Sequence, residues 1–307
     1  MESVTIGTRG SELALWQANY VAGKLHRLFP DTEIKQKLIT SKGDKILDVP
    51  LAKIGGKGLF TKELEEAMLT GEIDLAVHSL KDMPTKLPPG LTIAAVTKRE
   101  QPLDAVVSPT GQKLSALPTG AVIGTSSLRR QAQLLHYRAD LQIVNLRGNV
   151  NTRLAKLAAG EFDAVVLAAA GLYRLGKASV ITEILSPDVI LPAVGQGALA
   201  VEMPSDSPLK NKIARLNDEP TFIATSLERS FLSYIEGGCQ VPVGVYAQAG
   251  DKTVTATAII ASVNGSKLLR QSITGESERA AELGAKLAQN MLEAGGREIL
   301  QEIGLCA

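Results

Sequence analysis

Two short loops rich in glycine, serine and arginine constrain the fold of this chain more than any other part of its sequence. They span residues 124–131 and 146–153, and each carries two arginines. Each loop follows a short apolar run with strand character and precedes a helical pattern. In open α/β sheets such connections lie at the carboxyl ends of strands, where helix N-termini attract anions. The sequence therefore predicts layers of sheet and helix with an anion site at one sheet edge.

The region around these loops is strongly basic, although the whole chain is not. Residues 121–160 contain six Lys or Arg and a single acid, Asp140, whereas the formal net charge of the chain is +1. A guanidinium group matches a carboxylate or phosphate through two parallel hydrogen bonds. The cluster predicts a ligand with several carboxylates or phosphates. A solvated surface helix is the alternative, but surface charges usually alternate in sign.

Length and composition predict an ordinary globular protein. A chain of 307 residues suggests two or three domains, and 45% hydrophobic with 21% charged residues is typical of soluble proteins. Residues 1–7 lack the basic and apolar regions of a signal peptide, and the apolar run 164–172 is too short for a bilayer, which needs about 20 residues. We expect a cytoplasmic protein, or one of an organelle matrix after processing.

Strand and helix patterns alternate over roughly the first 200 residues, which favours an α/β fold. The first helix follows Ser11, a plausible N-cap, and the spacing of Leu13, Trp16, Tyr20, Leu25 and Leu28 predicts its buried face. A second helix is expected at 61–69, ending near Gly71, after a loop at 41–58. Strands are expected at 4–6, at 38–40 (a strand end), and at 74–78, 104–107, 121–124, 142–146 and 163–168.

The pattern changes from about residue 219. A long helix at 220–235 leads into a glycine-rich loop, and three consecutive strand patterns follow. Strands in sequence that are closed by helices predict a small α+β domain. The expected elements are strands at 243–248, 254–262 and 268–273 and helices at 276–293 and from 297.

Three groups of side chains could carry chemistry. Cys239 stands between a glycine pair and Val-Pro, so its thiol is a candidate nucleophile or attachment point, or else a buried inert cysteine. Asp82 follows a strand and could stabilise a cation or transfer protons, or simply cap a turn. Lys53 and Lys57 could fold over an anion, or belong to a solvated connection. Two cysteines without a CxxC motif and three isolated histidines predict neither a disulfide framework nor a metal site.

Six motifs, in order along essentially the whole chain, resemble those of the porphobilinogen deaminase (hydroxymethylbilane synthase) family. They are Thr8-Arg9-Gly10-Ser11-Glu12-Leu13-Ala14-Leu15, Ala76-Val77-His78-Ser79-Leu80-Lys81-Asp82, Gly124-Thr125-Ser126-Ser127-Leu128-Arg129-Arg130, Leu146-Arg147-Gly148-Asn149-Val150, Leu191-Pro192-Ala193-Val194-Gly195-Gln196-Gly197 and Glu236-Gly237-Gly238-Cys239.

The resemblance implies two periplasmic-binding-protein-like α/β domains flanking a cleft, plus a small C-terminal α+β domain with a three-stranded sheet. Domain 1 would comprise residues 1–98 and 198–216, and domain 2, which binds carboxylates, residues 99–197. Domain 3 would comprise residues 217–307 and carry Cys239.

The implied activity joins four porphobilinogen molecules head to tail, releases ammonia and hydrolyses off the linear tetrapyrrole hydroxymethylbilane. The implied cofactor is a dipyrromethane bound to Cys239 by a thioether. Asp82 would stabilise the cationic azafulvene-like intermediate and assist proton transfer. Each pyrrole carries an acetate and a propionate, and the resemblance assigns cofactor and substrate binding to Arg9, Ser11, Gln17, Lys53, Lys57, Ser79, Lys81, Thr125, Ser126, Ser127, Arg129, Arg130, Arg147, Gly148, Arg153, Arg174 and Gln196.

Two other classes of protein share some of these features. A polycarboxylate- or oxyanion-binding protein would share a bilobed fold and arginines, but it has no use for a cysteine after Gly237-Gly238 and usually carries an export signal. A nucleic-acid binder is disfavoured by 4% aromatic residues and the near-neutral charge. We therefore expect a monomer whose partner is porphobilinogen, with no nucleic acid and no membrane.

Overall fold

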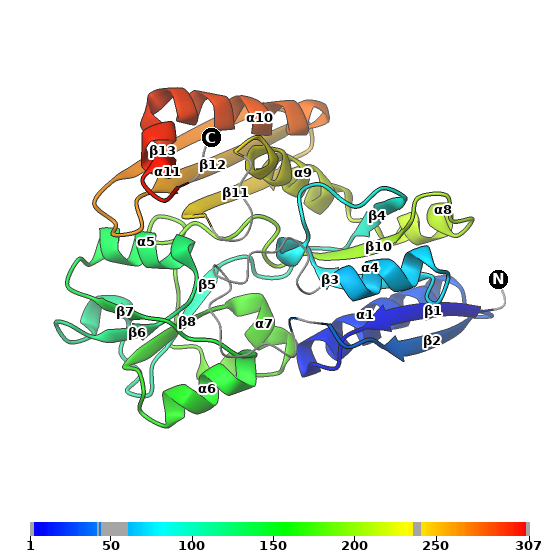
Figure 1. Cartoon of the computed structure of the whole chain (residues 1–307), viewed down its shortest axis with the longest axis horizontal. Helices are drawn as coiled ribbons and strands as arrows, with labels where there is room; N and C mark the ends of the chain where they lie inside the picture. Colours follow the sequence, from blue (N-terminus) through cyan, green and yellow to red (C-terminus); the bar gives the residue numbers. More distant parts are fainter. Residues whose placement is uncertain (1–2, 42, 44–60, 236–240, 305–307) are drawn as a thin grey trace. The chain divides into compact units, whose positions relative to one another are not determined.

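The structure is a computed structural model of the chain and describes residues 3–41, 43, 61–235 and 241–304. The chain divides into two compact units, whose elements are labelled in Figure 1. Unit 1 comprises Met1–Glu100 and Ala198–Phe222, and unit 2 comprises Gln101–Gly197 and Ile223–Ala307. The finer division into three domains stays a prediction. The expected loop at 41–58 lies almost wholly outside the described residues.

Unit 1 is built on a five-stranded mixed sheet. In spatial order its strands are β2 (Glu33–Leu38), β1 (Ser3–Thr8), β3 (Leu75–Ser79), β10 (Leu199–Pro204) and β4 (Leu91–Val96). β1 pairs in parallel with β2 and β3, whereas β10 runs antiparallel to β3 and β4. The carboxyl ends of β1 and β3 therefore lie at the same sheet edge, and the predicted residues after them are brought together there.

The helix α1 (Glu12–Leu28) covers one face of this sheet and begins where the sequence predicts. Ser11 caps it, because its Oγ accepts a hydrogen bond from the amide of Ala14 at 3.3 Å. The predicted buried face is shifted by about one residue, since Trp16 and Tyr20 are only half-buried and stack on each other at 5.2 Å between ring centroids. Smaller side chains let the helix lie close to the sheet, and the buried residues are Ala14, Gln17, Ala18, Val21 and Leu25.

The helix α4 (Lys62–Leu69) covers the opposite face. Side chains alternate along β3, so Leu75 and Val77 pack in the core with α1, while Ala76 packs with residues of α4. Thr70 caps the helix and Gly71 follows at φ 72°, a conformation that glycine adopts readily. The predicted helix and its glycine stop are confirmed.

Unit 2 contains a second five-stranded mixed sheet. In spatial order its strands are β7 (Gln142–Val144), β6 (Val122–Gly124), β8 (Ala164–Ala168), β5 (Asp104–Val107) and β9 (Glu183–Ile184). Packing against it are α5 (Leu128–Tyr137) on one face and α6 (Val150–Ala158) and α7 (Ala169–Arg174) on the other. All the strands predicted for this segment are present, with ends that differ by at most two residues.

The two mixed sheets have the same spatial order and directions of strands, although the antiparallel strand comes last along the chain in the first sheet and first in the second. In each, the first parallel strand (β1 or β6) lies between the second and third (β2 and β3, or β7 and β8), and an antiparallel strand (β10 or β5) then separates the third from the edge strand. An internal repeat of fold is therefore present although the sequence shows no repeat. Both copies offer the same place for a ligand, the carboxyl ends of their parallel strands.

The C-terminal part of unit 2 is an antiparallel sheet with helices. Its strands β11 (Val243–Ala249), β12 (Thr253–Ala261) and β13 (Leu268–Glu276) lie in sequence order. The helices α9 (Glu219–Tyr234), α10 (Ala280–Met291) and α11 (Arg297–Gln301) share one core with this sheet, and α10 lies across it in Figure 1. The predicted α/β fold with a C-terminal three-stranded sheet is confirmed.

Short elements complete the described chain. They are α8 (Lys210–Ile213), the 3-10 turns at Leu80–Asp82, Leu114–Ala116, Ala178–Val180, Ala214–Leu216 and Ser277–Arg279, and a π turn at Leu292–Gly296. No helix among the described residues is long and apolar enough to span a membrane.

Candidate functional site

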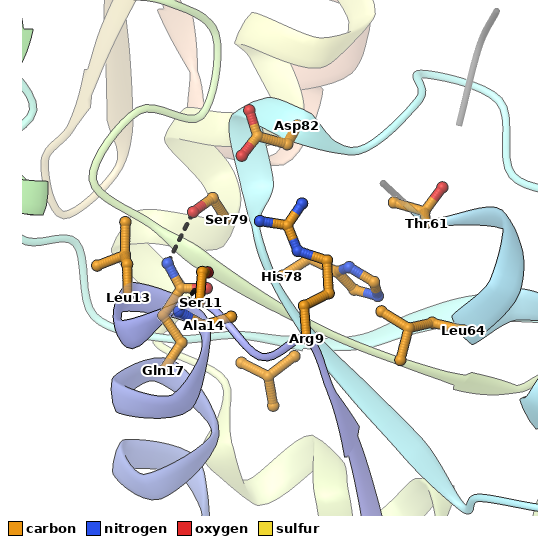
Figure 2. Close-up of a pocket in the computed structure, with 11 residues that line it drawn as sticks. Arg9, Ser11, Leu13, Ala14, Gln17, Thr61, Leu64, His78, Ser79 and Asp82 are labelled. Atoms are coloured by element: carbon orange, nitrogen blue, oxygen red, sulfur yellow. Dashed lines mark hydrogen bonds between the residues drawn. The ribbon is translucent and has the colours of Figure 1, made fainter. Parts of the chain in front are cut away.

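A pocket of unit 1 brings together five residues predicted from the sequence. It opens at the carboxyl ends of β1 and β3, beside the first turn of α1 (Figure 2). The predicted residues that line it are Arg9, Ser11, Gln17, Ser79 and Asp82. Another predicted residue of this unit, Lys81, precedes Asp82 and is half-buried.

Asp82 is held outward by its neighbours. It ends the short turn that follows β3, in which the amide of Leu80 donates to the carbonyl of Ala198 at 3.0 Å and the amide of Met83 to that of Leu80 at 3.1 Å. Leu80 and Met83 are buried, whereas Asp82 is exposed. Within the described residues its carboxylate has no hydrogen-bond or ion-pair partner, so it is not a capping aspartate there. The carboxylate is presented to the pocket.

The other polar side chains of the pocket are held by the secondary structure. Gln17 reaches from α1 to the end of β3, and its Nε2 donates to the Oγ of Ser79 at 2.8 Å. Figure 2 shows this hydrogen bond and the guanidinium of Arg9 directed toward Asp82. Since the N-terminus of α1 also lies here, the pocket combines cationic and N–H groups with one exposed carboxylate.

The inner wall of the pocket contains titratable groups that sequence reasoning missed. His78 lines the pocket, and its Nε2 lies 3.1 Å from Oε2 of Glu202 on the neighbouring strand β10. Glu65 of α4 is buried on the same side of the sheet. Burial is the largest influence and raises the pKa of Glu65. A hydrogen bond with Thr61 opposes this rise, and the charge of Glu202 adds to it by a lesser amount.

The first arginine loop connects β6 to α5 in unit 2, as predicted. Ser127 is the N-cap of α5 and its Oγ accepts a hydrogen bond from the amide of Arg130. Thr125 Oγ1 accepts from the amide of Ser127 at 3.3 Å, and Ser126 Oγ donates to the carbonyl of Leu146 at 3.1 Å. These hydroxyl groups therefore shape the loop, and the Ser126 bond ties it to the second arginine loop.

Arg129 and Arg130 are both buried and share one carboxylate, that of Asp104. Asp104 also accepts a hydrogen bond from Gln196 Nε2 at 2.9 Å. Burial alone would raise the pKa of Asp104, but the two guanidinium charges and their hydrogen bonds outweigh burial and hold this pKa well below its usual range. Sequence reasoning did not identify Asp104 as a site residue. The feature that could have identified it is a single charged residue at the start of an otherwise apolar strand.

The second arginine loop connects β7 to α6. Asn149 caps α6 by accepting from the amide of Thr152 at 2.9 Å, and Gly148 adopts φ 111° in the turn before it. Arg153 Nε donates to the carbonyl of Gly148 at 2.8 Å. Nη1 of Arg147 is buried and has no hydrogen-bond partner in the described part of the chain. Buried N–H groups of this kind normally have a hydrogen-bond partner.

The remaining predicted residues are placed as follows. Arg174, in α7, is buried and its Nη2 donates to the carbonyl of Gly197 at 2.6 Å. Cys239, Lys53 and Lys57 lie outside the described residues. No group of three or more His, Cys, Asp or Glu among the described residues is arranged to hold a metal ion.

Comparison with known protein families assigns both parts of the chain. The profile of the porphobilinogen deaminase dipyrromethane cofactor binding domain matches residues 4–211, and that of the porphobilinogen deaminase C-terminal domain matches residues 222–293. The chain belongs to the porphobilinogen deaminase family. It is therefore an enzyme that joins porphobilinogen molecules into a linear tetrapyrrole with release of ammonia, and dipyrromethane is its cofactor.

Curated porphobilinogen deaminases match this chain over nearly its whole length. The protein from Desulforamulus reducens is 51% identical over 301 residues, which cover 98% of this chain and 97% of that protein. The one from Syntrophotalea carbinolica is 50% identical over 304 residues, covering 99% and 96%.

Solved structures similar in fold include ligand-binding proteins of transporters. A probable amino-acid ABC transporter extracellular-binding protein from Bacillus subtilis is 10% identical with a TM-score of 0.42, covering 70% of this chain and 90% of that one. A periplasmic sulfonate-binding protein from Methylobacillus flagellatus is 15% identical with a TM-score of 0.42, covering 77% and 72%. Scores of this size carry no functional argument, and the porphobilinogen deaminase assignment does not depend on them.

Proposed function

We propose that Cys239 carries the dipyrromethane through a thioether, and that Asp82 is the catalytic carboxylate of this porphobilinogen deaminase. The carboxylates of cofactor and substrate are bound by cationic, hydroxyl and amide side chains of both units. The observation that carries the proposal is the exposed Asp82 carboxylate beside Arg9 in the pocket of unit 1. The binding residues are Arg9, Ser11, Gln17, Lys53, Lys57, Ser79, Lys81, Thr125, Ser126, Ser127, Arg129, Arg130, Arg147, Gly148, Arg153, Arg174 and Gln196.

The described residues fit a cofactor that carries several carboxylates. Arg147 has a buried Nη1 without a partner among them, and the N-termini of α5 and α6 lie beside the same two loops. Gly148 at φ 111° has no side chain to keep a ligand from its backbone. When bound, the dipyrromethane supplies the ring carbon to which the first substrate is joined.

Asp82 would act when ammonia leaves the substrate. With the amine in its protonated form, the bond between the aminomethyl carbon and nitrogen breaks, its electron pair leaves with ammonia, and the positive charge passes to the ring nitrogen. A carboxylate close to this nitrogen stabilises the charge, most strongly when the ligand has displaced water. The same carboxylate would then accept the proton released from the ring carbon at which the new carbon–carbon bond forms.

Arg9 and Ser11 would hold the substrate carboxylates while this happens. Arg9 is half-buried at the end of β1, and the N-terminus of α1 adds N–H groups that favour an anion. A cation nearer the ring nitrogen would oppose the developing charge. The proposed site therefore uses cationic groups for the acetate and propionate and a single anionic group for the ring.

We further infer that the enzyme acts as a cytoplasmic monomer and binds neither nucleic acid nor membrane. The near-neutral net charge of +1 and the 4% aromatic content support the part of this inference that concerns nucleic acid. Size-exclusion chromatography with light scattering tests the monomer, and a stable dimer at low concentration contradicts it.

Intact-protein mass spectrometry of the denatured enzyme tests the attachment. We expect an adduct equal to two porphobilinogen units less two ammonia. The Cys239→Ser protein should lack this adduct and make no tetrapyrrole, while Cys306→Ser, which changes the other cysteine, should keep both. An adduct that persists in Cys239→Ser, or that maps to Cys306, contradicts the proposal.

A further inference from the structure

A buried charge network in unit 2 suggests a role for a residue that does not contact the ligand. Asp104 begins β5 and is completely buried. Its carboxylate accepts hydrogen bonds from Arg129 Nη1 and Arg130 Nη2, both at 2.7 Å, and from Gln196 Nε2 at 2.9 Å. Charge-assisted bonds of this length fix both partners, so Asp104 determines where the two guanidinium groups lie.

The two arginines differ in which of their N–H groups make no hydrogen bond within the protein. Arg130 also donates from Nη1 to the carbonyl of Val166 at 2.9 Å, and its Nε is buried without a hydrogen-bond partner among the described residues. The hydrogen bonds of the Arg129 side chain all come from Nη1, which Asp104 shares with the carbonyl of Leu191. Within the described part of the chain, Nε and Nη2 of Arg129 have no partner. Unlike Nε of Arg130, these two Arg129 atoms are not among the fully buried unpartnered atoms, so Arg129 is the member of the pair whose unpartnered donors a ligand can reach.

The backbone of Leu191, whose carbonyl accepts from Arg129, is itself held by a residue other than Asp104. Gln133, one turn along α5 from Arg129, donates from Nε2 to that carbonyl at 3.2 Å and accepts from the amide of Leu191 at 2.7 Å. The position of Arg129 is therefore fixed from two sides, by an acid on β5 and by a clamped backbone.

Charge balance gives Asp104 a second effect. One buried carboxylate against two buried guanidinium groups leaves one net positive charge. Without Asp104, two like charges would lie together in a low-dielectric interior, an arrangement that is strongly unfavourable without a counter-ion. With Asp104 present, a single ligand carboxylate neutralises the network.

We propose that Asp104 is the positioning residue of the cofactor site, holding Arg129 so that its remaining N–H groups meet one carboxylate of the dipyrromethane, and leaving the arginine pair with a charge that this one carboxylate balances. The identity of the ligand rests on the proposed function, whereas the charge balance does not.

The charge balance is tested in protein without cofactor. Asp104→Asn is introduced into the Cys239→Ser protein. The melting temperature of this double variant is compared with that of the Cys239→Ser protein. Two unbalanced buried guanidinium groups should lower it by on the order of 10 °C. Adding Arg130→Gln to this double variant restores a single net positive charge in the network. The triple variant should therefore have a higher melting temperature than the double variant.

The positioning role is tested by loading of the Cys239-intact protein. Porphobilinogen is supplied during folding, and the fraction of folded molecules with the adduct is measured by mass spectrometry. Asp163→Asn is the control for removal of an aspartate beside the same sheet. Asp163 is exposed, accepts a hydrogen bond from the amide of Val122 at 2.7 Å and has no arginine partner among the described residues. We expect folded Asp104→Asn to be at least tenfold poorer in adduct than folded Asp163→Asn.

The two arms separate the possible failures. Equal adduct in folded Asp104→Asn and Asp163→Asn would show a merely structural aspartate and overturn the positioning role. If Arg130→Gln gives no recovery, or if Asp104→Asn/Arg130→Gln also fails to fold, the charge balance is refuted. If the parent protein itself carries no adduct, the proposed function fails, and the melting temperatures still decide the charge balance.

Discussion

Replacing Asp82 by asparagine tests the catalytic assignment with little disturbance to the fold. Asp82 is exposed, and its carboxylate has no hydrogen-bond or ion-pair partner among the described residues. The amide has the same shape, and Leu80 and Met83, which hold the turn, are unchanged. The free energy of unfolding should therefore change by no more than about 0.5 kcal/mol.

The effect on rate should be much larger. Loss of one preorganised electrostatic contact typically reduces the rate about 10²–10³-fold, and loss of a general acid or base about 10²–10⁴-fold. Because water reaches the Asp82 carboxylate in the free enzyme, we take the lower part of each range of rate factors. The two factors do not simply multiply, because both roles belong to one carboxylate. We expect a fall of about 10³-fold in kcat, equivalent to roughly 4 kcal/mol of transition-state stabilisation.

The assay is single-turnover release of ammonia, with native mass spectra of the elongated enzyme. Asp82→Glu keeps the charge but moves it by one methylene, so it should retain weak activity and accumulate partly elongated enzyme. Asp31→Asn, which removes another exposed carboxylate of unit 1, is the control and should be fully active. Near-normal turnover in Asp82→Asn would mean that another group stabilises the cation, and the assigned role would be wrong.

Two further predictions concern other charged groups. Arg129→Leu should leave largely apo protein, whereas Arg9→Leu should keep the cofactor and stall turnover; equal occupancy of the cofactor in the two variants, measured by mass, would refute this division. The raised pKa of Glu65 means that the folded state binds its proton more tightly than the unfolded state, so stability falls as pH rises from about 4.5 through the raised pKa and then levels off. Glu65→Gln should remove this loss. In urea unfolding, the free energy of unfolding of Glu65→Gln minus that of the parent should therefore increase as pH rises from about 4.5 through the raised pKa. Glu66→Gln, on the exposed side of the same helix, should show no such trend, and a flat difference for Glu65→Gln would contradict the reasoning.

The elements of the fold were predictable where a local pattern specifies them. The strand at Asp104–Val107 and the helix cap at Ser11 follow from short apolar runs and from a hydroxyl before a helical pattern. The strands β4 and β10 were not predicted. β10 pairs with strands more than 100 residues before it in the chain, and no local signal specifies such a partner.

The candidate site was predictable as a set of residue types but not as a set of contacts. The charge pattern identifies the arginine loops, and the structure places Ser11, Gln17 and Ser79 in one pocket with Asp82. No local pattern indicates that Arg129 and Arg130 share the carboxylate of Asp104. The acid lies on strand β5, 25 residues before Arg129, whereas the arginines lie on helix α5. Long-range pairing of charges is a tertiary property, and it decides which arginine N–H groups remain for a ligand.

The position of β10 has a consequence for how the chain is made. β10 lies between β3 and β4 in space, but it is formed by Leu199–Pro204, after every strand of the second sheet. At a synthesis rate of roughly 5–20 residues per second, β3 and β4 wait on the order of 5 to 20 seconds for their shared neighbour. Until then each presents an unpaired edge, which is a site for association with other chains or with chaperones. The second sheet, whose strands all lie between Asp104 and Ile184, can close first. Of the two mixed sheets, the N-terminal one is therefore begun first and finished last, and its protection on the ribosome depends on a segment not yet synthesised.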